Sequence, residues 1–423
     1  MSVAGPRAFL ESLFAAAVAA VRPDNIPASQ FPPMPDGRLI VVGAGKAAAA
    51  MAAAVERHYG KGMEGLVIVP DGYGRACKYI DVVEASHPLP DERGTAAAAR
   101  ILGLVQEAGA QDLVLCLISG GASALMALPA PGVSLADKRA VTSALLRGGA
   151  GIGETNCVRK HPSAIKGGRL AAAAVPARVV SLIVSDVVGD DPAVIASGPT
   201  VADPTTCRYA LAILKKYDVP TPPHVLAALS DGRLETPKTL AQGITRIIAR
   251  PADAFAAAKA QLQAHGVAVI GLGDRCEGEA RTAAAMHATL VRDICAGRGS
   301  VRPPCAILSG GELVVTVTGN GRGGPNTEFA LALALELNGL SDVWALAADT
   351  DGRDGNAGAA GAFIDPSTLA RAKAAGRDPT AALAQHDSAG FFDSLGDLVN
   401  PGPTFTNVND FRVILVGPPT QGP

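Results

Sequence analysis

The sequence predicts an α/β protein with two domains, the first built on an open, mostly parallel β-sheet. Short apolar runs alternate with alanine-rich stretches of helical periodicity, which is typical of such sheets. At 423 residues the chain is longer than one hydrophobic core usually organises. The segment 219–250 is rich in proline and in small or polar residues, so we place the boundary there and expect domains at residues 1–235 and 236–423.

Composition excludes several classes of protein. The formal net charge is −2 and no basic run stands out, so we expect no nucleic acid partner. No stretch approaches the roughly 20 apolar residues of a membrane span, so we expect no membrane partner either. The seven cysteines form no C-x-x-C pair, which predicts reduced thiols in a cytoplasmic protein. The seven histidines show no metal-binding spacing, and we interpret His87 and His161 as loop residues.

The first expected element is an amphipathic helix that ends before Pro23. Its apolar residues recur at spacings of three and four, namely Leu10, Leu13, Phe14, Val18 and Val21. Strands are then expected at residues 39–42, 66–69, 80–85, 113–118 and 179–184. Open parallel sheets bind ligands at the carboxyl ends of their strands, so the residues that follow these runs are the first candidates for a site.

Beyond the boundary the sequence predicts a second series of helices and strands. Helices are expected at residues 252–265, 279–295 and 327–337. Buried strands are expected at 267–272, 344–348 and 411–416, with one more ending at Ser309. The alternation of residues 313–318 indicates an exposed or hairpin strand.

Glycine turns follow three of the expected strands. Ser-Gly-Gly ends an apolar run at residues 119–121 and again at 309–311, and paired glycines let backbone N–H groups face an anion. An ordinary strand-to-loop turn is the alternative for either one alone, but two copies favour phosphate binding. Residues 43–46 read Gly-Ala-Gly-Lys before a helix. Lys46 there fits a cation that reaches a transferring phosphoryl group, with a solvated lysine as the alternative.

Two charged segments follow in the N-terminal half. Residues 156–169 include five basic side chains, counting the histidine, which indicates an anion clamp or a solvated helix face. Residues 185–200 then bring Asp186, Asp190 and Asp191 together after a strand. Neighbouring carboxylates are stable mainly in water or around a cation, so this segment predicts the Mg²⁺ site of a phosphoryl-transfer enzyme. A helix-capping turn is the alternative.

Three loops of the C-terminal half suit a polar small molecule. Glu312 follows the second Ser-Gly-Gly turn, and the glycine-rich loop after it carries Arg322, which fits bidentate binding of a carboxylate or phosphate. A flexible linker is the alternative for that loop. Asp351 follows the strand at 344–348, while Asn407 and Asn409 lie in a loop that suits either a hydroxylated substrate or a plain turn.

Taken together, these motifs resemble those of the type II glycerate kinases, or glycerate 2-kinases, and the C-terminal portion resembles the MOFRL domain. The resemblance covers essentially the whole chain and rests on residues 42–46, 119–123, 185–200, 309–312, 321–324, 350–352 and 406–410. It implies a Rossmann-like N-terminal domain, a MOFRL-type C-terminal domain and an active site in the cleft between them. The implied reaction is the ATP- and Mg²⁺-dependent conversion of D-glycerate to 2-phosphoglycerate, and a homodimer is left open.

Motifs and resemblance together assign roles to individual residues. The expected catalytic residues are Lys46, Arg322 and Asp186. The expected nucleotide-binding residues are Gly45, Ser119, Gly120, Gly121, Ala122, Ser123, Lys160 and Lys166. Those expected to bind substrate are Arg322, Asn326, Asp351, Asn407 and Asn409. The expected metal ligands are Asp190, Asp191 and Glu312.

The chain departs from the family pattern at one position. Family members often carry arginine before the asparagine of the glycine-rich loop, where this chain has Pro325-Asn326, and Arg322 is the nearest replacement in that loop. Proteins of this type are sometimes labelled hydroxypyruvate reductases, so an NAD(P)H-dependent reductase is the alternative function. The first glycine turn lacks a convincing acid for a nicotinamide ribose, which argues against that alternative.

Overall fold

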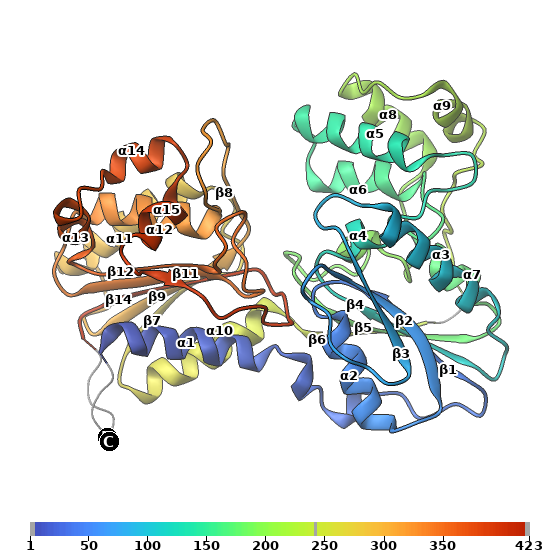
Figure 1. Cartoon of the computed structure of the whole chain (residues 1–423), viewed down its shortest axis with the longest axis horizontal. Helices are drawn as coiled ribbons and strands as arrows, with labels where there is room; N and C mark the ends of the chain where they lie inside the picture. Colours follow the sequence, from blue (N-terminus) through green and yellow to red (C-terminus); the bar gives the residue numbers. More distant parts are fainter. Residues whose placement is uncertain (1–4, 241–242, 419–423) are drawn as a thin grey trace. The chain divides into compact units, whose positions relative to one another are not determined.

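The computed structural model describes residues 5–240 and 243–418, which divide into two compact units. Unit 1 is built from Met1–Val21 and Arg250–Pro423, and unit 2 from Arg22–Ala249. Each unit has its own six-stranded sheet (Figure 1). The prediction of a two-domain α/β protein is confirmed.

Unit 2 contains a fully parallel sheet with strand order β3-β2-β1-β4-β5-β6. This is the Rossmann order, in which the direction of strand addition reverses between β1 and β4. The strands are β1 Leu39–Ala44, β2 Met63–Pro70, β3 Ile80–Ala85, β4 Leu113–Ile118, β5 Arg178–Val184 and β6 Ile244–Ala249. The helices are α2 Ala48–Tyr59, α3 Glu92–Gln106, α4 Ala122–Leu125, α5 Leu135–Arg147, α6 Ile152–Lys160, α7 Arg169–Ala173, α8 Cys207–Lys216 and α9 Pro223–Ser230. Short 3₁₀ turns lie at Pro23–Asn25, Ala28–Gln30 and Ile195–Ser197.

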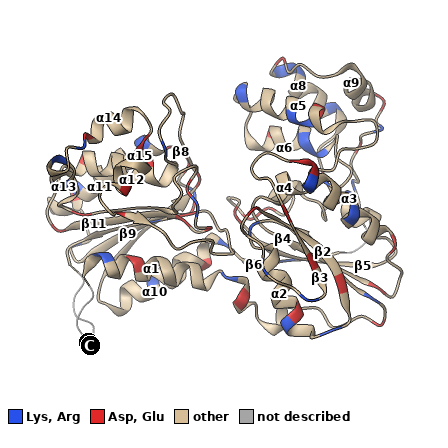
Figure 2. Cartoon of the chain, in the orientation of Figure 1, with Lys and Arg blue, Asp and Glu red and all other residues tan. Residues whose placement is uncertain are grey.

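Strands β1 and β4 are buried along their whole length, which explains their continuous apolar sequence. Val42 of β1 packs in one core with Ile101 of α3, on one face of the sheet. Helices α5, α6, α8 and α9 enclose a separate small core that includes Leu145, Val158 and Ile213. Two basic residues end each of α6 and α8, where positive charge complements the helix dipole (Figure 2).

Unit 1 contains a mixed sheet of order β13-β12-β11-β14-β9-β7, in which only β7 and β9 are parallel neighbours. Its strands are β7 Ala268–Gly273, β9 Cys305–Gly311, β11 Val343–Asp349, β12 Gly361–Ile364, β13 Leu398–Val399 and β14 Asp410–Val416, with β8 Gly278–Glu279 and β10 Leu313–Val314 forming a small separate pair. Its helices are α1 Pro6–Ala20, α10 Pro251–Ala264, α11 Ala280–Cys295, α12 Pro325–Leu337, α13 Thr368–Ala374, α14 Pro379–Ala384 and α15 Ser388–Asp393. Helices α1 and α10 lie together against one face, and α11 and α12 cover the other (Figure 1).

The two units differ from the expected domains in two places. Helix α1 has the predicted apolar stripe, but it packs in unit 1, where Phe14 meets Phe411 with ring centroids 6.0 Å apart. Unit 2 extends to Ala249 rather than residue 235, because β6 pairs with β5 as an edge strand. The proline-rich segment 219–250, where we placed the boundary, therefore contains both α9 and β6.

Two further expectations concern the surface. The strand expected over residues 313–318 is limited to β10, because its partner β8 is equally short. None of the helices in the described parts of the chain combines the length and the apolar character that crossing a bilayer requires.

Candidate functional site

The loops that leave β1 and β4 are bonded to each other at the point where the strand order of unit 2 reverses. Lys46 N donates a hydrogen bond to Gly120 O at 2.9 Å, and Ala47 N donates to the buried Ser119 Oγ at 3.0 Å. Gly45 has φ +126°, and a Cβ there would lie 2.2 Å from Ser119 Oγ. Only glycine lets the two loops approach this closely. Ligands of doubly wound sheets bind at such a reversal point.

Gly121, in the loop after β4, lies close to the side chains of His87 and Lys46. It has φ +86°, and a Cβ there would lie 3.1 Å from His87 Nε2 and 3.8 Å from Lys46 Cγ. Lys46 and His87 therefore flank the glycine turn. His87 follows β3, and sequence reasoning did not include it among the site residues. A single histidine before proline does not indicate that its side chain will lie beside the loop after β4.

Lys166 contacts Ser123, which follows this loop. Its side chain is buried, and Nζ donates to Ser123 O at 2.7 Å and to Ser123 Oγ at 3.2 Å. Ser123 Oγ is also 2.9 Å from Ser197 Oγ. Burial, with the nearby charges of Arg159 and Lys138, holds the pKa of Lys166 well below its usual value. An anion bound nearby would favour the charged form of this lysine.

Lys160 lies apart from that group. Its Nζ forms a buried ion pair with Asp203 Oδ1 at 3.2 Å. Asp203 also accepts hydrogen bonds from the hydroxyls of Thr205 and Thr236. This lysine is thus held by a carboxylate of its own unit.

The three aspartates expected at the metal side all lie in the loop after β5. Asp186 and Asp190 are half-buried, while Asp191 is exposed and its Oδ1 accepts the N–H of Ala193 at 2.9 Å. Asp190 has φ +55°, which turns the chain sharply between its neighbours. The loop places the carboxylates at the same carboxyl edge of the sheet that carries Lys46.

In unit 1 the strand register gathers a second polar group. Asp410, the first residue of β14, is opposite both Gly311 at the end of β9 and Asp349 at the end of β11. Arg412, which is only 1% exposed, donates from Nη2 to Asp410 Oδ2 at 2.6 Å and to Gly311 O at 2.9 Å. Exposed Glu312 follows directly. Sequence reasoning missed Asp410 and Arg412, because their meeting with Gly311 depends on the antiparallel register.

Asn326 lies at the start of α12 between two carboxylates. Its Nδ2 donates to Asp410 Oδ1 at 2.7 Å, and its backbone N donates to Asp354 Oδ1 at 2.9 Å. Asp354 also accepts hydrogen bonds from the backbone N and hydroxyl of Thr327, so it caps α12 from a distant loop. Burial, together with the charge of Asp410, raises the pKa of Asp354 to about 7 despite these donors.

The loops of Asp351, Asn407 and Asn409 are bonded together at the same edge. Thr350 Oγ1 donates to Asn409 O at 2.7 Å, and Thr404 N donates to Asp351 O at 3.2 Å. Asn409 N in turn donates to Asn407 Oδ1 at 3.2 Å. The three expected substrate-binding residues are thus brought into one loop cluster.

Arg322 is placed differently. Its side chain is exposed and Nη2 forms an ion pair with Asp393 Oδ2 at 3.0 Å, while its backbone N donates to Asp387 Oδ1. Asn326, at the start of α12, turns inward to Asp410. The structure therefore separates the two residues that the sequence places together.

Comparison with known proteins adds a second line of argument. A protein-family model described as "Domain of unknown function (DUF4147)" matches residues 9–230, and the MOFRL family model matches residues 305–410. A protein of Agrobacterium vitis named putative hydroxypyruvate reductase is 49% identical over 97% of this chain and 94% of its own length. The D-glycerate 2-kinase of Thermotoga maritima is 40% identical over 94% of this chain and 95% of its own. A crystal structure of glycerate kinase from the same organism matches with a TM-score of 0.87 and 38% identity, covering 97% of this chain and 99% of that one.

Proposed function

Because the chain belongs to the glycerate kinase family, we propose that it transfers the γ-phosphoryl group of ATP to the 2-hydroxyl of D-glycerate with the help of Mg²⁺. Unit 2 supplies the phosphate-binding residues in this proposal, and unit 1 supplies the residues that hold glycerate. The observation that carries it is the bonded pair of loops at the strand reversal, which brings Lys46 beside Gly121.

We also infer a reducing compartment such as the cytoplasm, since all seven cysteines are free thiols.

The fit of unit 2 to a polyphosphate rests on its backbone and its cations. Gly45 and Gly121 both occupy positive φ where a side chain would crowd the loop, so the main chain is free of Cβ atoms at two positions where an anionic oxygen would approach it. Lys46 would bear on the transferring phosphoryl group, and Lys166 would hold Ser123 in place or gain a proton when phosphate binds. Catalysis of this kind is mostly positioning and electrostatic stabilisation.

Carboxylate oxygens suit the Mg²⁺ that this reaction needs. Within unit 2 the proposed ligands are Asp190 and Asp191, and Asp186 is proposed to orient the attacking hydroxyl. When bound, the ion would neutralise charge on the phosphate oxygens. Asp191 has one oxygen engaged by its own turn, which leaves the second for a cation.

Asn326 gives the strongest support for glycerate binding in unit 1. Its amide is oriented by donation from Nδ2 to Asp410, so Oδ1 points elsewhere. That Oδ1 is buried and has no hydrogen-bond partner among the residues that the structure describes. A buried acceptor left in this way costs free energy until it meets a donor, and a substrate hydroxyl is such a donor. Asp351, Asn407 and Asn409 would contact the remaining polar groups of glycerate. Arg322 would bind the carboxylate of glycerate only after breaking its ion pair with Asp393.

An ADP-release assay with D-glycerate, ATP and Mg²⁺ tests the proposal. Enolase alone as the coupling enzyme should convert the product to phosphoenolpyruvate, since it acts on 2-phosphoglycerate and not on the 3-isomer. Folded protein that releases no glycerate-dependent ADP would contradict the proposed activity. Product that needs a mutase before enolase would contradict the 2-position only.

The reductase alternative rests on the name of the Agrobacterium vitis relative. In a dinucleotide-binding fold the acid after β2 binds the ribose. Here that acid is Asp71, and both of its oxygens accept hydrogen bonds from Arg93, at 2.8 and 2.9 Å. We therefore favour the kinase, and hydroxypyruvate-dependent oxidation of NADH or NADPH would reverse this choice.

A further inference from the structure

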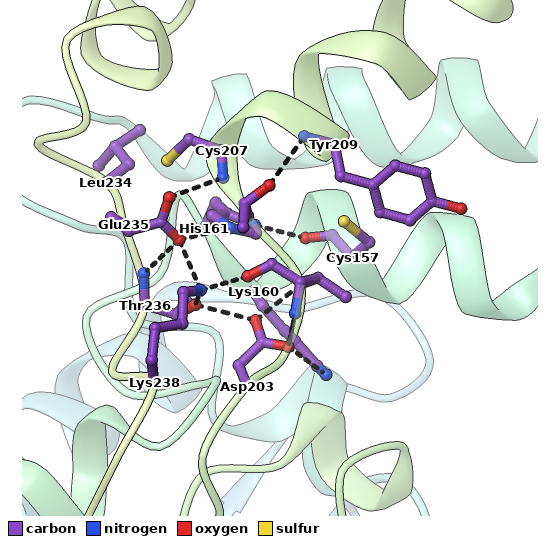
Figure 3. Close-up of polar contacts among 12 residues, drawn as sticks. Cys157, Lys160, His161, Asp203, Cys207, Tyr209, Leu234, Glu235, Thr236 and Lys238 are labelled. Atoms are coloured by element: carbon purple, nitrogen blue, oxygen red, sulfur yellow. Dashed lines mark hydrogen bonds and ion pairs between the residues drawn. The ribbon is translucent and has the colours of Figure 1, made fainter.

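Three metal-ligating side chains converge in unit 2 from separate elements. His161 follows α6, Cys207 begins α8, and Glu235 lies in the loop after α9 (Figure 3). One ligand atom from each lies within 4.8 Å of the other two. None of the three is among the residues that we assign to nucleotide, glycerate or Mg²⁺.

His161 presents a free ring nitrogen to this cluster. Its side chain is 0% exposed, and Nδ1 lies 2.8 Å from Cys157 O. A carbonyl oxygen only accepts, so the ring proton is on Nδ1 and the lone pair is on Nε2. Nε2 has no hydrogen-bond partner among the described residues, although Glu235 Oε1 is 3.5 Å away. The lone pair of Nε2 therefore faces the carboxylate of Glu235, and neither atom donates a proton to the other. A cation bound between them would remove this unfavourable contact.

The other two side chains complete a mixed donor set. Cys207 is buried, and its backbone N donates to Glu235 Oε2 at 3.0 Å. Lys238 and the N–H of Thr236 also bind this carboxylate and contribute to holding the pKa of Glu235 at about 2, so it is ionised. Burial raises the pKa of Cys207 to about 12, so without a metal it is a thiol.

Neighbouring contacts fix the backbone beside two of these ligands. Lys160, next to His161, and Thr236, next to Glu235, both donate to Asp203. Arg169 also links the two segments, since it donates to Lys160 O at 3.0 Å and to Leu234 O at 2.7 Å. Such outer contacts are typical of sites that orient metal ligands.

We propose that His161, Cys207 and Glu235 bind one Zn²⁺ ion, with water as the fourth ligand. Imidazole, thiolate and carboxylate together favour Zn²⁺ over Mg²⁺, which prefers oxygen alone. Neighbouring ligands around tetrahedral Zn²⁺ lie roughly 3.3–3.8 Å apart, so the 3.5 Å between His161 Nε2 and Glu235 Oε1 already fits. Binding forms a Zn–S bond and releases the thiol proton of Cys207 to solvent. The ion would join α6, α8 and the loop after α9, and thus stabilise the small helical core of unit 2.

Cobalt titration of the chelator-treated full-length protein tests this proposal. Co²⁺ should bind one per chain and give a thiolate-to-cobalt charge-transfer band in the near ultraviolet, and Zn²⁺ should abolish the band. Cys207→Ser should lose the band. Cys157→Ser is the matched control, because Cys157 is also a buried thiol of this helical group, and the variant should keep the band.

Stability provides a second readout. Zn²⁺ should raise the melting temperature of the chelator-treated wild type and of Cys157→Ser, but not of Cys207→Ser or Glu235→Gln. Circular dichroism establishes that each variant is folded, and Glu235→Gln gives a second test if Cys207→Ser does not fold. A folded wild type without the cobalt band, or a band that persists in Cys207→Ser, would overturn the proposal.

Discussion

At the scale of single residues, the chemistry of unit 2 centres on Lys46. Positive charge at the start of α2 opposes the helix dipole, and an anion bound there would offset this repulsion. Its backbone N–H is held by Gly120 O, which directs the side chain along the Gly121 turn. A group placed in this way is expected to act on the transition state more than on substrate binding.

Replacing Lys46 by alanine tests this role. We expect kcat to fall by about 10²-fold or more while KM for glycerate changes little, because the lost interaction is made mainly in the transition state. Steady-state kinetics measures both constants. Lys61→Ala, at an exposed position after the same helix, is the control and should leave both unchanged. A large change in KM alone would assign Lys46 to substrate binding.

Asp354 is the residue of unit 1 whose titration has the clearest consequence. Its pKa in the folded protein is about 7, above the value of about 3.9 expected when unfolded. Between these two values the folded state binds more protons, so this group's contribution to stability is full below about pH 4 and is lost as pH rises through 7. The cause is burial beside Asp410, which outweighs the donors at the start of α12.

Asp354→Asn should remove this dependence. The variant is expected to lose about 1–3 kcal/mol of stability at low pH, since an amide cannot accept from both backbone N–H groups. The difference in free energy of unfolding between wild type and variant should shrink from pH 4 to pH 8, as measured by urea titration. Exposed Asp36→Asn is the control and should give a difference that does not vary with pH in this way. A difference that grows with pH would show that the carboxylate is held ionised.

At the scale of elements, two sheet edges set the positions of the functional side chains. The register of β1 and β4 ends both strands together, at Ala44 and Ile118, so their loops begin side by side. In unit 1 the antiparallel register places Asp410 between the ends of β9 and β11. In both cases strand pairing between segments far apart in the chain determines which residues become neighbours.

Gly45→Ala tests how tightly the loops after β1 and β4 are joined. The added Cβ would lie 2.2 Å from Ser119 Oγ and 2.5 Å from Ser119 O at a positive φ, so the loops must separate. We expect a loss of at least about 2 kcal/mol in the free energy of unfolding, together with weaker ATP binding. Gly103→Ala in α3 is the matched control, since its Cβ meets nothing within 4 Å. That variant should gain about 0.5–1 kcal/mol, and equal stability of the two variants would contradict the close approach.

At the scale of the whole molecule, the chain leaves unit 1 after α1, forms unit 2, and returns at Arg250. Helix α1 belongs to unit 1 because its apolar stripe is buried against α10 and the sheet there, as the contact of Phe14 with Phe411 indicates. Unit 2 is by contrast one continuous segment whose last strand is β6.

This arrangement predicts which fragment folds. A fragment of residues 22–249 should unfold cooperatively, as measured by circular dichroism during urea titration. A fragment of residues 22–235 lacks β6 and exposes the edge of β5, so it should be less stable or aggregate. A fragment of residues 1–235 carries α1 without its partner α10, and exposes the apolar stripe. Equal stability of 22–235 and 22–249 would contradict the boundary at Ala249.

The sequence by itself determined what depends on neighbours along the chain. Apolar runs at 39–42 and 113–118 predicted buried strands, since such runs are soluble only when both faces are covered. The stripe of α1 predicted its helix, and the turns after β1 and β4 predicted where Lys46 and Ser119 would lie. Loop glycines and strand endings are local properties, so they can be recognised without knowing the fold.

Tertiary structure alone decided what depends on distant pairing. Strand register brought Asp410 to Gly311, and a loop far along the chain brought Asp354 to the start of α12. Helix packing in the small core brought His161 to Glu235, although neither shows a metal-binding spacing in the sequence. Local residue patterns encode secondary structure, whereas these contacts arise from burying apolar surfaces that lie far apart in the chain. The sheet edges that carry Lys46 and Ser119 were therefore predictable, whereas the distant residues that meet in unit 1 and in the small helical core were not.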